Sequence, residues 1–129
     1  MTTVVFTATD DCGNASTTTA TFTVEDTTAP ELTTPAVALN LECSADDQQS
    51  AINDWLAING GASSVDQCSD TNIVWTNNYT VGSDNTDCGA SGTVLVTFTA
   101  TDDCGLFITT TAAITIEDTT APTLSLIHI

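Results

Sequence analysis

The sequence contains no lysine and no arginine, against 17 aspartates and glutamates, and this gives the 129-residue chain a formal net charge of −17. Binding to nucleic acids and to anionic lipids depends on clustered basic side chains that neutralise phosphates. We therefore expect the chain to bind neither. Carboxylates without basic partners cannot form conventional salt bridges, so their repulsion has to be relieved by solvent, salt or a bound metal.

Two further absences bear on function. No stretch approaches the roughly 20 apolar residues of a membrane-spanning helix, and residues 1–4 lack the basic segment that begins a signal peptide. The single histidine, His128, lies in residues 124–129, which resemble a translated sequencing adapter. Without an internal histidine, lysine or arginine, a nucleophile has no partner base and an oxyanion has no basic side chain to hold it. We expect no enzyme activity, no catalytic residues and no cofactor-binding residues.

An internal repeat is the strongest pattern in the sequence. Residues 4–32 and 96–124 align at an offset of 92, with 21 identities in 29 positions. This similarity predicts tandem modules of 92 residues. The expected divisions are the C-terminal hairpin of a truncated preceding repeat at 1–28, one complete repeat at 29–120, and the start of a next repeat or a non-native tail at 121–129.

The composition and the alternation of side chains favour strands. Threonine, which is β-branched and suits strands, occurs 28 times. Residues 93–101 and 108–117 alternate apolar and polar side chains, which predicts a half-buried antiparallel hairpin closed by a turn at 102–105. Further strands are expected at 38–43 and 72–79. Together they predict an all-β, immunoglobulin-like antiparallel β-sandwich.

One segment departs from the β pattern. Ile52, Trp55 and Asn59 recur at helical spacing, and a Gly-Gly pair follows them. This predicts one short helix, at about 45–59, inserted between two strands. Its apolar side is expected to pack into the core, where Trp55 and Trp75 are candidates to meet.

Cysteine usage points to an oxidising compartment. Cys12 is the repeat counterpart of Cys104, so the complete repeat holds four of the five cysteines. An even number in a small β domain without a C-x-x-C motif is typical of disulfides. We expect an extracellular chain, secreted or at the cell surface, with a free thiol at Cys12. The alternative is a cytosolic protein with reduced cysteines.

Four cysteines allow three pairings. If the four predicted strands take the places of strands B, C, F and G of an immunoglobulin sandwich, the segment before C and the turn after F lie at the same end. This arrangement favours a disulfide between Cys68 and Cys104. It leaves Cys43 to pair with Cys88.

Acidic residues gather at the predicted turns and at the repeat junctions. The same topology places the linker before a repeat near the loops at one end of that repeat, so their carboxylates would face one another. Oxygen ligands in that number suit Ca²⁺, which takes about six to eight of them. The predicted ligands are Glu25, Asp26, Asp70, Asp102 and Asp103, with Asp66 as an alternative to Asp70. The other interpretation is that these acids are solvated turn residues that keep a surface protein soluble.

The segment VTFTATDDCG at 96–105, followed by a threonine-rich strand and by EDTTAP at 117–122, resembles HYR-like and related immunoglobulin-like repeats. Those repeats occur in large secreted surface proteins of Bacteroidetes. The resemblance covers the full repeat and is most specific at 96–122. It implies a non-catalytic spacer or adhesive unit of an adhesin or a gliding-type filament. EDTTAP also stands where cadherins carry an acidic, proline-terminated calcium linker.

We therefore expect an extracellular repeat module of a large bacterial cell-surface protein, stiffened by Ca²⁺ at the module junctions. The expected partners are adjacent repeats of the same chain, together with surface glycans or other cells. The alternative is a module that binds a glycan or ice directly, for example through the threonine ladder of Thr97, Thr99 and Thr101.

Residues 1–25 raise a separate expectation. They form a single hairpin with one apolar face, and an isolated hairpin is marginally stable in water. We expect this segment to dock on the complete repeat or to fray.

Overall fold

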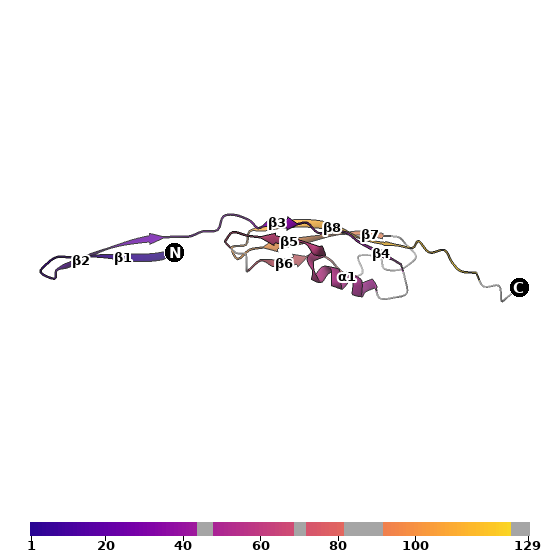
Figure 1. Cartoon of the computed structure of the whole chain (residues 1–129), viewed down its shortest axis with the longest axis horizontal. Helices are drawn as coiled ribbons and strands as arrows, with labels where there is room; N and C mark the ends of the chain where they lie inside the picture. Colours follow the sequence, from indigo (N-terminus) through magenta and orange to yellow (C-terminus); the bar gives the residue numbers. More distant parts are fainter. Residues whose placement is uncertain (44–47, 69–71, 82–91, 125–129) are drawn as a thin grey trace.

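The computed structural model describes residues 1–43, 48–68, 72–81 and 92–124, and it shows an all-β sandwich with one short inserted helix (Figure 1). In chain order the elements are β1 (Thr2–Thr9), β2 (Ala15–Phe22), β3 (Glu31–Thr34), β4 (Leu39–Glu42), α1 (Gln48–Ala57), a 3₁₀ turn (Asn59–Gly61), β5 (Ser63–Val65), β6 (Val74–Asn77), β7 (Gly92–Thr101) and β8 (Phe107–Glu117). Among the described residues, no helix reaches the length and hydropathy that crossing a bilayer requires.

The main sheet has four strands in the order β4-β8-β7-β6, and β3 pairs with β5 in a small second sheet. β7 runs antiparallel to both β8 and β6, as expected. The expectation for residues 38–43 is wrong in one respect, because β4 does not take the place of strand B. It joins the same sheet as the other three strands and runs parallel to β8, with Leu39 opposite Ile114. There it covers the free edge of β8.

The predicted alternation in the β7–β8 hairpin is confirmed. Side chains on one face are buried, and their neighbours are half-buried or exposed. The buried apolar side chains are Val96, Phe98, Ala100, Ala112, Ile114 and Ile116, and Thr110 is buried on the same face. Threonines fill much of the opposite face, where they pair across the strands as Thr97 with Thr111 and Thr99 with Thr109. Such β-branched pairs stabilise a sheet locally.

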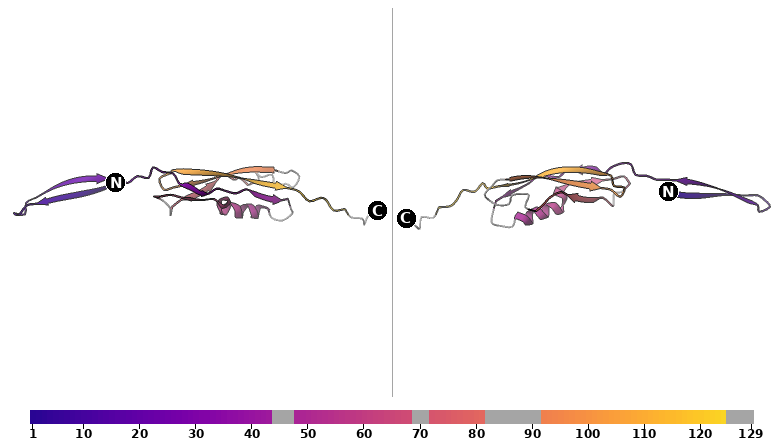
Figure 2. Two further views of the ribbon diagram at one scale, coloured as in Figure 1. Left: turned by 45° about the horizontal axis from the view of Figure 1, so that its top comes forward. Right: turned by 180° about the vertical axis from the view of Figure 1, so that it is seen from behind.

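Helix α1 covers the buried face of this hairpin (Figure 2). It is shorter than the predicted 45–59 segment, of which residues 45–47 lie outside the described part. Ile52 is fully buried and Trp55 is 7% exposed, so the helical spacing read from the sequence identifies the correct face. The Trp55 ring meets Phe98 edge-on at 5.1 Å, and its Nε1 donates a hydrogen bond to the Val37 carbonyl at 2.9 Å. Trp75 packs against the same cluster from β6.

The β1–β2 hairpin repeats the geometry of β7–β8. Val4 lies opposite Ala20, as Val96 lies opposite Ala112, so the two registers match at the repeat offset of 92. The segment does not dock on the complete repeat, because it forms a separate two-stranded sheet that stands apart from the sandwich (Figure 1). That it frays in solution stays a prediction. Within this chain, the place that it would occupy is already filled by β7–β8.

The turn after α1 needs a glycine at one position. Gly60 is buried with φ of 65°, in the left-handed region that favours glycine. A Cβ added there would lie 3.0 Å from Phe98 Cε2 and 3.2 Å from Trp55 Cζ2. Gly61 also has a positive φ, of 82°, but an added Cβ would meet nothing within 4 Å.

We predict that Gly60→Ala destabilises the fold more than Gly61→Ala. Both substitutions strain the backbone by about 1–2 kcal/mol, and Gly60→Ala adds overpacking that costs about 1–3 kcal/mol. Urea unfolding followed by tryptophan fluorescence measures both losses. Equal losses for the two variants would contradict the packing of Phe98 and Trp55 around Gly60.

Candidate metal centre at the N-terminal linker

Asp26, Asp66 and Asp102 form the same local turn, which also occurs at Asp10 and Asp118. In each, Oδ1 accepts a hydrogen bond from the backbone N–H two residues further on, at 3.0 Å for Asp26, 2.8 Å for Asp66 and 2.8 Å for Asp102. Aspartate forms such turns readily because its short side chain reaches its own backbone. The turns fix the direction of each carboxylate, so the second oxygen of each is held in a defined place.

The strand pairing brings these three turns to one end of the sandwich. β3 and β5 are antiparallel, with Glu31 opposite Val65, so the linker before β3 (residues 23–30, the N-terminal linker) lies beside Asp66. β6 and β7 are also antiparallel, with Val74 opposite Thr101, so the segment before β6 lies beside the turn after β7. The loops and the N-terminal linker therefore converge.

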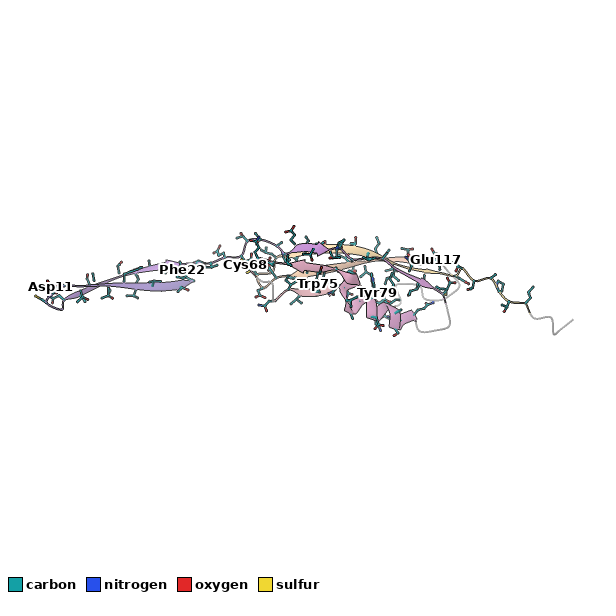
Figure 3. All side chains as sticks on the ribbon, in the orientation of Figure 1. Asp11, Phe22, Cys68, Trp75, Tyr79 and Glu117 are labelled. Carbon is teal, nitrogen blue, oxygen red and sulfur yellow. The ribbon has the colours of Figure 1, made fainter. Side chains whose placement is uncertain are left out.

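Among the residues that the structure describes, five side chains meet at this end, and we name them the junction cluster: Asp26, Asp66, Cys68, Asp102 and Cys104. The potential ligand atoms of Asp26, Asp66 and Cys68 lie within 4.8 Å of one another, and so do those of Asp26, Asp102 and Cys104. Asp26, from the N-terminal linker, belongs to both groups. Figure 3 shows Cys68 at the end of the sandwich that faces this linker.

Two carboxylate oxygens in the junction cluster are buried without a hydrogen-bond partner. They are Oδ2 of Asp26 and Oδ2 of Asp102, and the Asp102 side chain is only 6% exposed. An unpaired buried acceptor costs free energy, and more so when it is charged. A cation bound between these oxygens would remove that cost.

The first hairpin shows how the same turn is satisfied without a cation. Oδ1 of Asp10 accepts the amide N–H of Asn14 at 2.8 Å, and Oδ2 accepts its side-chain Nδ2–H at 3.1 Å. The repeat counterpart of Asn14 is Leu106, which donates only its backbone N–H, to Oδ1 of Asp102 at 2.9 Å. The change from asparagine to leucine therefore leaves Oδ2 of Asp102 without a protein donor.

The structure brings together only part of the predicted ligand set. Asp26 and Asp102 share the junction cluster, and Asp66, the alternative ligand, joins them. Asp103 belongs to neither ligand group, and its Oδ2 accepts a hydrogen bond from Asn72 Nδ2 at 2.8 Å. Glu25 is exposed and outside the cluster too, and Asp70 falls outside the described residues. The two thiols were not expected as ligand atoms, although the shared Asp-x-Cys spacing at 66–68 and 102–104 would have pointed to them.

The predicted disulfide between Cys68 and Cys104 is not formed. Both are free thiols, although the topology places them at the same end, as expected. Each sulfur lies instead beside the Asp26 carboxylate. The predicted location of the two cysteines is therefore correct, and the predicted disulfide bond between them is wrong.

The observed states of Cys12 and Cys43 agree with the states predicted from the sequence. Cys12 is an exposed free thiol, as expected. Cys43 is disulfide-bonded. Cys88, its predicted partner, lies outside the described residues, so this pairing stays a prediction.

The acids of the junction cluster act on the neighbouring thiol. The negative charge of Asp26 raises the pKa of Cys68 above its ordinary value of 9.0, and desolvation and the charge of Asp66 add to the effect. A thiol with a raised pKa stays protonated at neutral pH, and the thiolate is the form that binds soft metals. Before any cation binds, the cluster therefore offers mainly carboxylate oxygens.

The C-terminal linker (residues 118–124) repeats the turn of the N-terminal one. Asp118, the counterpart of Asp26, accepts the amide N–H of Thr120 at 3.2 Å. Glu42 of β4 also holds this linker, since its carboxylate accepts the amide of Thr119 at 2.7 Å and its hydroxyl at 2.6 Å. Figure 3 shows Glu117 near this linker, at the end of the sandwich away from Cys68.

In comparisons with known proteins, no family model and no curated protein sequence matches the chain. The resemblance to HYR-like repeats therefore remains an expectation from the sequence. The arguments for function below depend on the geometry of the junction cluster and the two linkers.

We predict that Asp26→Asn accelerates alkylation of Cys68. Removing the negative charge that raises the pKa of this thiol most lowers that pKa, so more thiolate is present at pH 8 and iodoacetamide reacts faster. Because the chain has no lysine or arginine, trypsin cannot release the Cys68 peptide, and a protease that cleaves at acidic or aromatic residues is used before mass spectrometry. The control is Asp11→Asn, at the far tip of the first hairpin (Figure 3). An equal rate in both variants would contradict the placement of Asp26.

We also predict that acid releases the C-terminal linker. Hydrogen bonds from the hydroxyl and the amide of Thr119 lower the pKa of Glu42 below its ordinary value of 4.5. The attachment is therefore complete above pH 4.5 and is lost as the pH falls through the lowered pKa of the attached state. The amide NMR shift of Thr119 should follow this titration, and Glu42→Gln should abolish it. Glu117→Gln is the matched control, and a titration unchanged in Glu42→Gln would refute the assignment.

Proposed function

We propose that residues 29–120 form a non-catalytic extracellular repeat module, a spacer or adhesive unit of a large bacterial cell-surface protein. In this proposal Ca²⁺ binds at the junction cluster and fixes the N-terminal linker to the module. Adjacent repeats of the same chain are the primary partners, and glycans or other cells are contacted by the assembled array. The absence of lysine, arginine and internal histidine supports a role without catalysis.

The observation that carries the proposal is the buried, unpartnered Oδ2 of Asp102, which lies in one ligand group with Asp26 of the N-terminal linker. A cation that binds both carboxylates joins the linker to the turn after β7. Asp66, which follows β5, shares the other ligand group with Asp26, so the same linker carboxylate also faces this turn. Binding of a cation would therefore restrict rotation of the β1–β2 hairpin, which precedes the linker, relative to the sandwich.

The donor set favours Ca²⁺ over a softer metal. Each ligand group holds two carboxylates, Asp26 with Asp102 or Asp26 with Asp66. Two carboxylates can supply up to about four oxygens if each binds through both of its oxygens, and backbone carbonyls and water would complete the usual shell of Ca²⁺. A pocket lined in part by Thr28, Glu31 and Asp66 borders the cluster at Asp66.

The two linkers would allow the same contact between a linker and the next module to recur along a tandem array. They leave the sandwich at opposite ends, so successive modules would follow one another in line (Figure 2). Asp118 carries the same turn toward the C-terminal side that Asp26 carries at the N-terminal side. Each linker could thus supply one carboxylate to the module that follows it.

Direct binding of a glycan or ice is the second candidate, because threonines pair across the outer face of β7–β8. The same row includes Leu95 opposite Ala113, and Leu95 is 70% exposed, so the ladder is interrupted. Threonine on a strand also has a sufficient structural role through its β propensity. The spacer role accounts for more of the observed features.

We predict that Ca²⁺ raises the melting temperature of the full chain. At a free concentration about 100-fold above Kd, binding adds roughly 2.7 kcal/mol, which is about 10 °C or more for a domain of this size. Thermal unfolding is followed in chelator, in Ca²⁺ and in Mg²⁺ at matched ionic strength. Asp102→Asn should remove most of the Ca²⁺ shift, whereas Asp103→Asn, whose carboxylate lies outside the cluster, should keep it.

A second variant separates metal binding from general stability. Leu106→Asn restores the asparagine of the first hairpin, so its side-chain N–H can satisfy Oδ2 of Asp102 as Asn14 satisfies Asp10. We expect this variant to melt higher in chelator and to gain less from Ca²⁺. Equal shifts in Ca²⁺ and Mg²⁺ would indicate charge screening alone, and a larger shift in Zn²⁺ would refute the choice of metal.

A further inference from the structure

One face of the β1–β2 hairpin is apolar and uncovered. The side chains on this face come from alternate positions of the two strands and of the residue pair after β2. They are Val4, Phe6, Ala8, Ala20, Phe22 and Val24. Phe6 is 57% exposed, Phe22 53% and Val24 83%. The face carries no charged residue, although the chain as a whole is strongly acidic.

The same face is completely buried in the second copy of this hairpin. Phe6 corresponds to Phe98, which has no exposed surface, and Phe22 corresponds to Ile114, which is 1% exposed. The cross-strand register is the same in both hairpins. The difference in exposure therefore arises from what lies over the hairpin and not from the hairpin itself.

In β7–β8, three elements provide this cover. Ile52 and Trp55 of α1 lie over the face, and β4 and β6 pair with the two outer edges of the hairpin. Leu39, Leu41 and Trp75 extend the apolar contact from these edge strands. In β1–β2 the corresponding edges and the corresponding face have no partner among the described residues.

We infer that the apolar face of β1–β2 is a docking surface for a chain segment built like residues 29–81, with counterparts of β4, α1 and β6. The segment would add one parallel and one antiparallel strand to the hairpin edges and lay its helix across Phe6 and Phe22. The module at 29–120 cannot serve as this partner, because its own β7–β8 hairpin fills the position. The inference does not depend on the metal site.

The test adds a segment that contains β4, α1 and β6 before the β1–β2 hairpin of the same chain. Residues 29–92 are joined before residue 1 of the complete 129-residue chain, which restores the repeat spacing because residue 1 corresponds to residue 93. Amide hydrogen exchange is measured by NMR in this extended chain and in the original chain. We expect protection at the amides of β1 and β2 to rise at least about 100-fold in the extended chain.

Two neighbouring substitutions locate the contact. Phe6→Asp places a charge on the apolar face, and Val5→Asp places the same charge on the opposite face of β1, where Val5 is 59% exposed. In the extended chain, Phe6→Asp should abolish the added protection and Val5→Asp should retain it. In the original chain, both variants should leave the melting temperature of the sandwich unchanged, because both side chains are exposed there.

Three outcomes would overturn the inference. The first is unchanged protection of β1–β2 in the extended chain. The second is equal loss of protection in Phe6→Asp and Val5→Asp. The third is protection that appears in the original chain as its concentration rises and is lost in Phe6→Asp, since a second copy of the chain would then be the partner.

Discussion

The burial of one face of the β7–β8 hairpin is the interaction on which the rest of the structure depends. Phe98 and Ile114 lie at the centre of this face, and α1 closes over them with Ile52 and Trp55. The edge strands β4 and β6 are held by pairing with the same hairpin. Because apolar burial is the dominant favourable term in folding, loss of this contact would release the helix and both edge strands together. The close approach of Gly60 to Phe98 belongs to the same contact.

The fold also determines where the acidic residues can accumulate. With no basic side chain to pair with, carboxylates are tolerated in turns and linkers, where water or the backbone can satisfy them. The pairing of β3 with β5 and of β6 with β7 then draws three such turns to one end of the sandwich. The junction cluster thus has two causes. The carboxylates lie in turns because the chain has no basic partners for them, and strand pairing brings three of these turns together.

The sequence predicts the parts of this structure that have long periodic patterns. Alternation over ten or more residues identifies β7 and β8 and their buried face, and the spacing of Ile52 and Trp55 identifies the helix. β3 and β5 have four and three residues, too few for a pattern to emerge. The parallel pairing of β4 depends on which edge of β8 is free, and this is a property of the tertiary structure. Spacing alone could not decide it.

The candidate site shows the same division between local and tertiary information. Topology suffices to bring Asp26 and Asp102 together, but the contrast between Asn14 and Leu106 decides whether the second carboxylate oxygen has a donor. The aligned repeats show that Asn14 is replaced by Leu106. Only the structure shows that the side chain of Asn14 donates a hydrogen bond to Asp10, so that its replacement removes a donor. A tandem sequence therefore provides an internal comparison: where two copies of one turn differ at a single hydrogen-bond donor, the copy without the donor has a carboxylate oxygen left open to another partner.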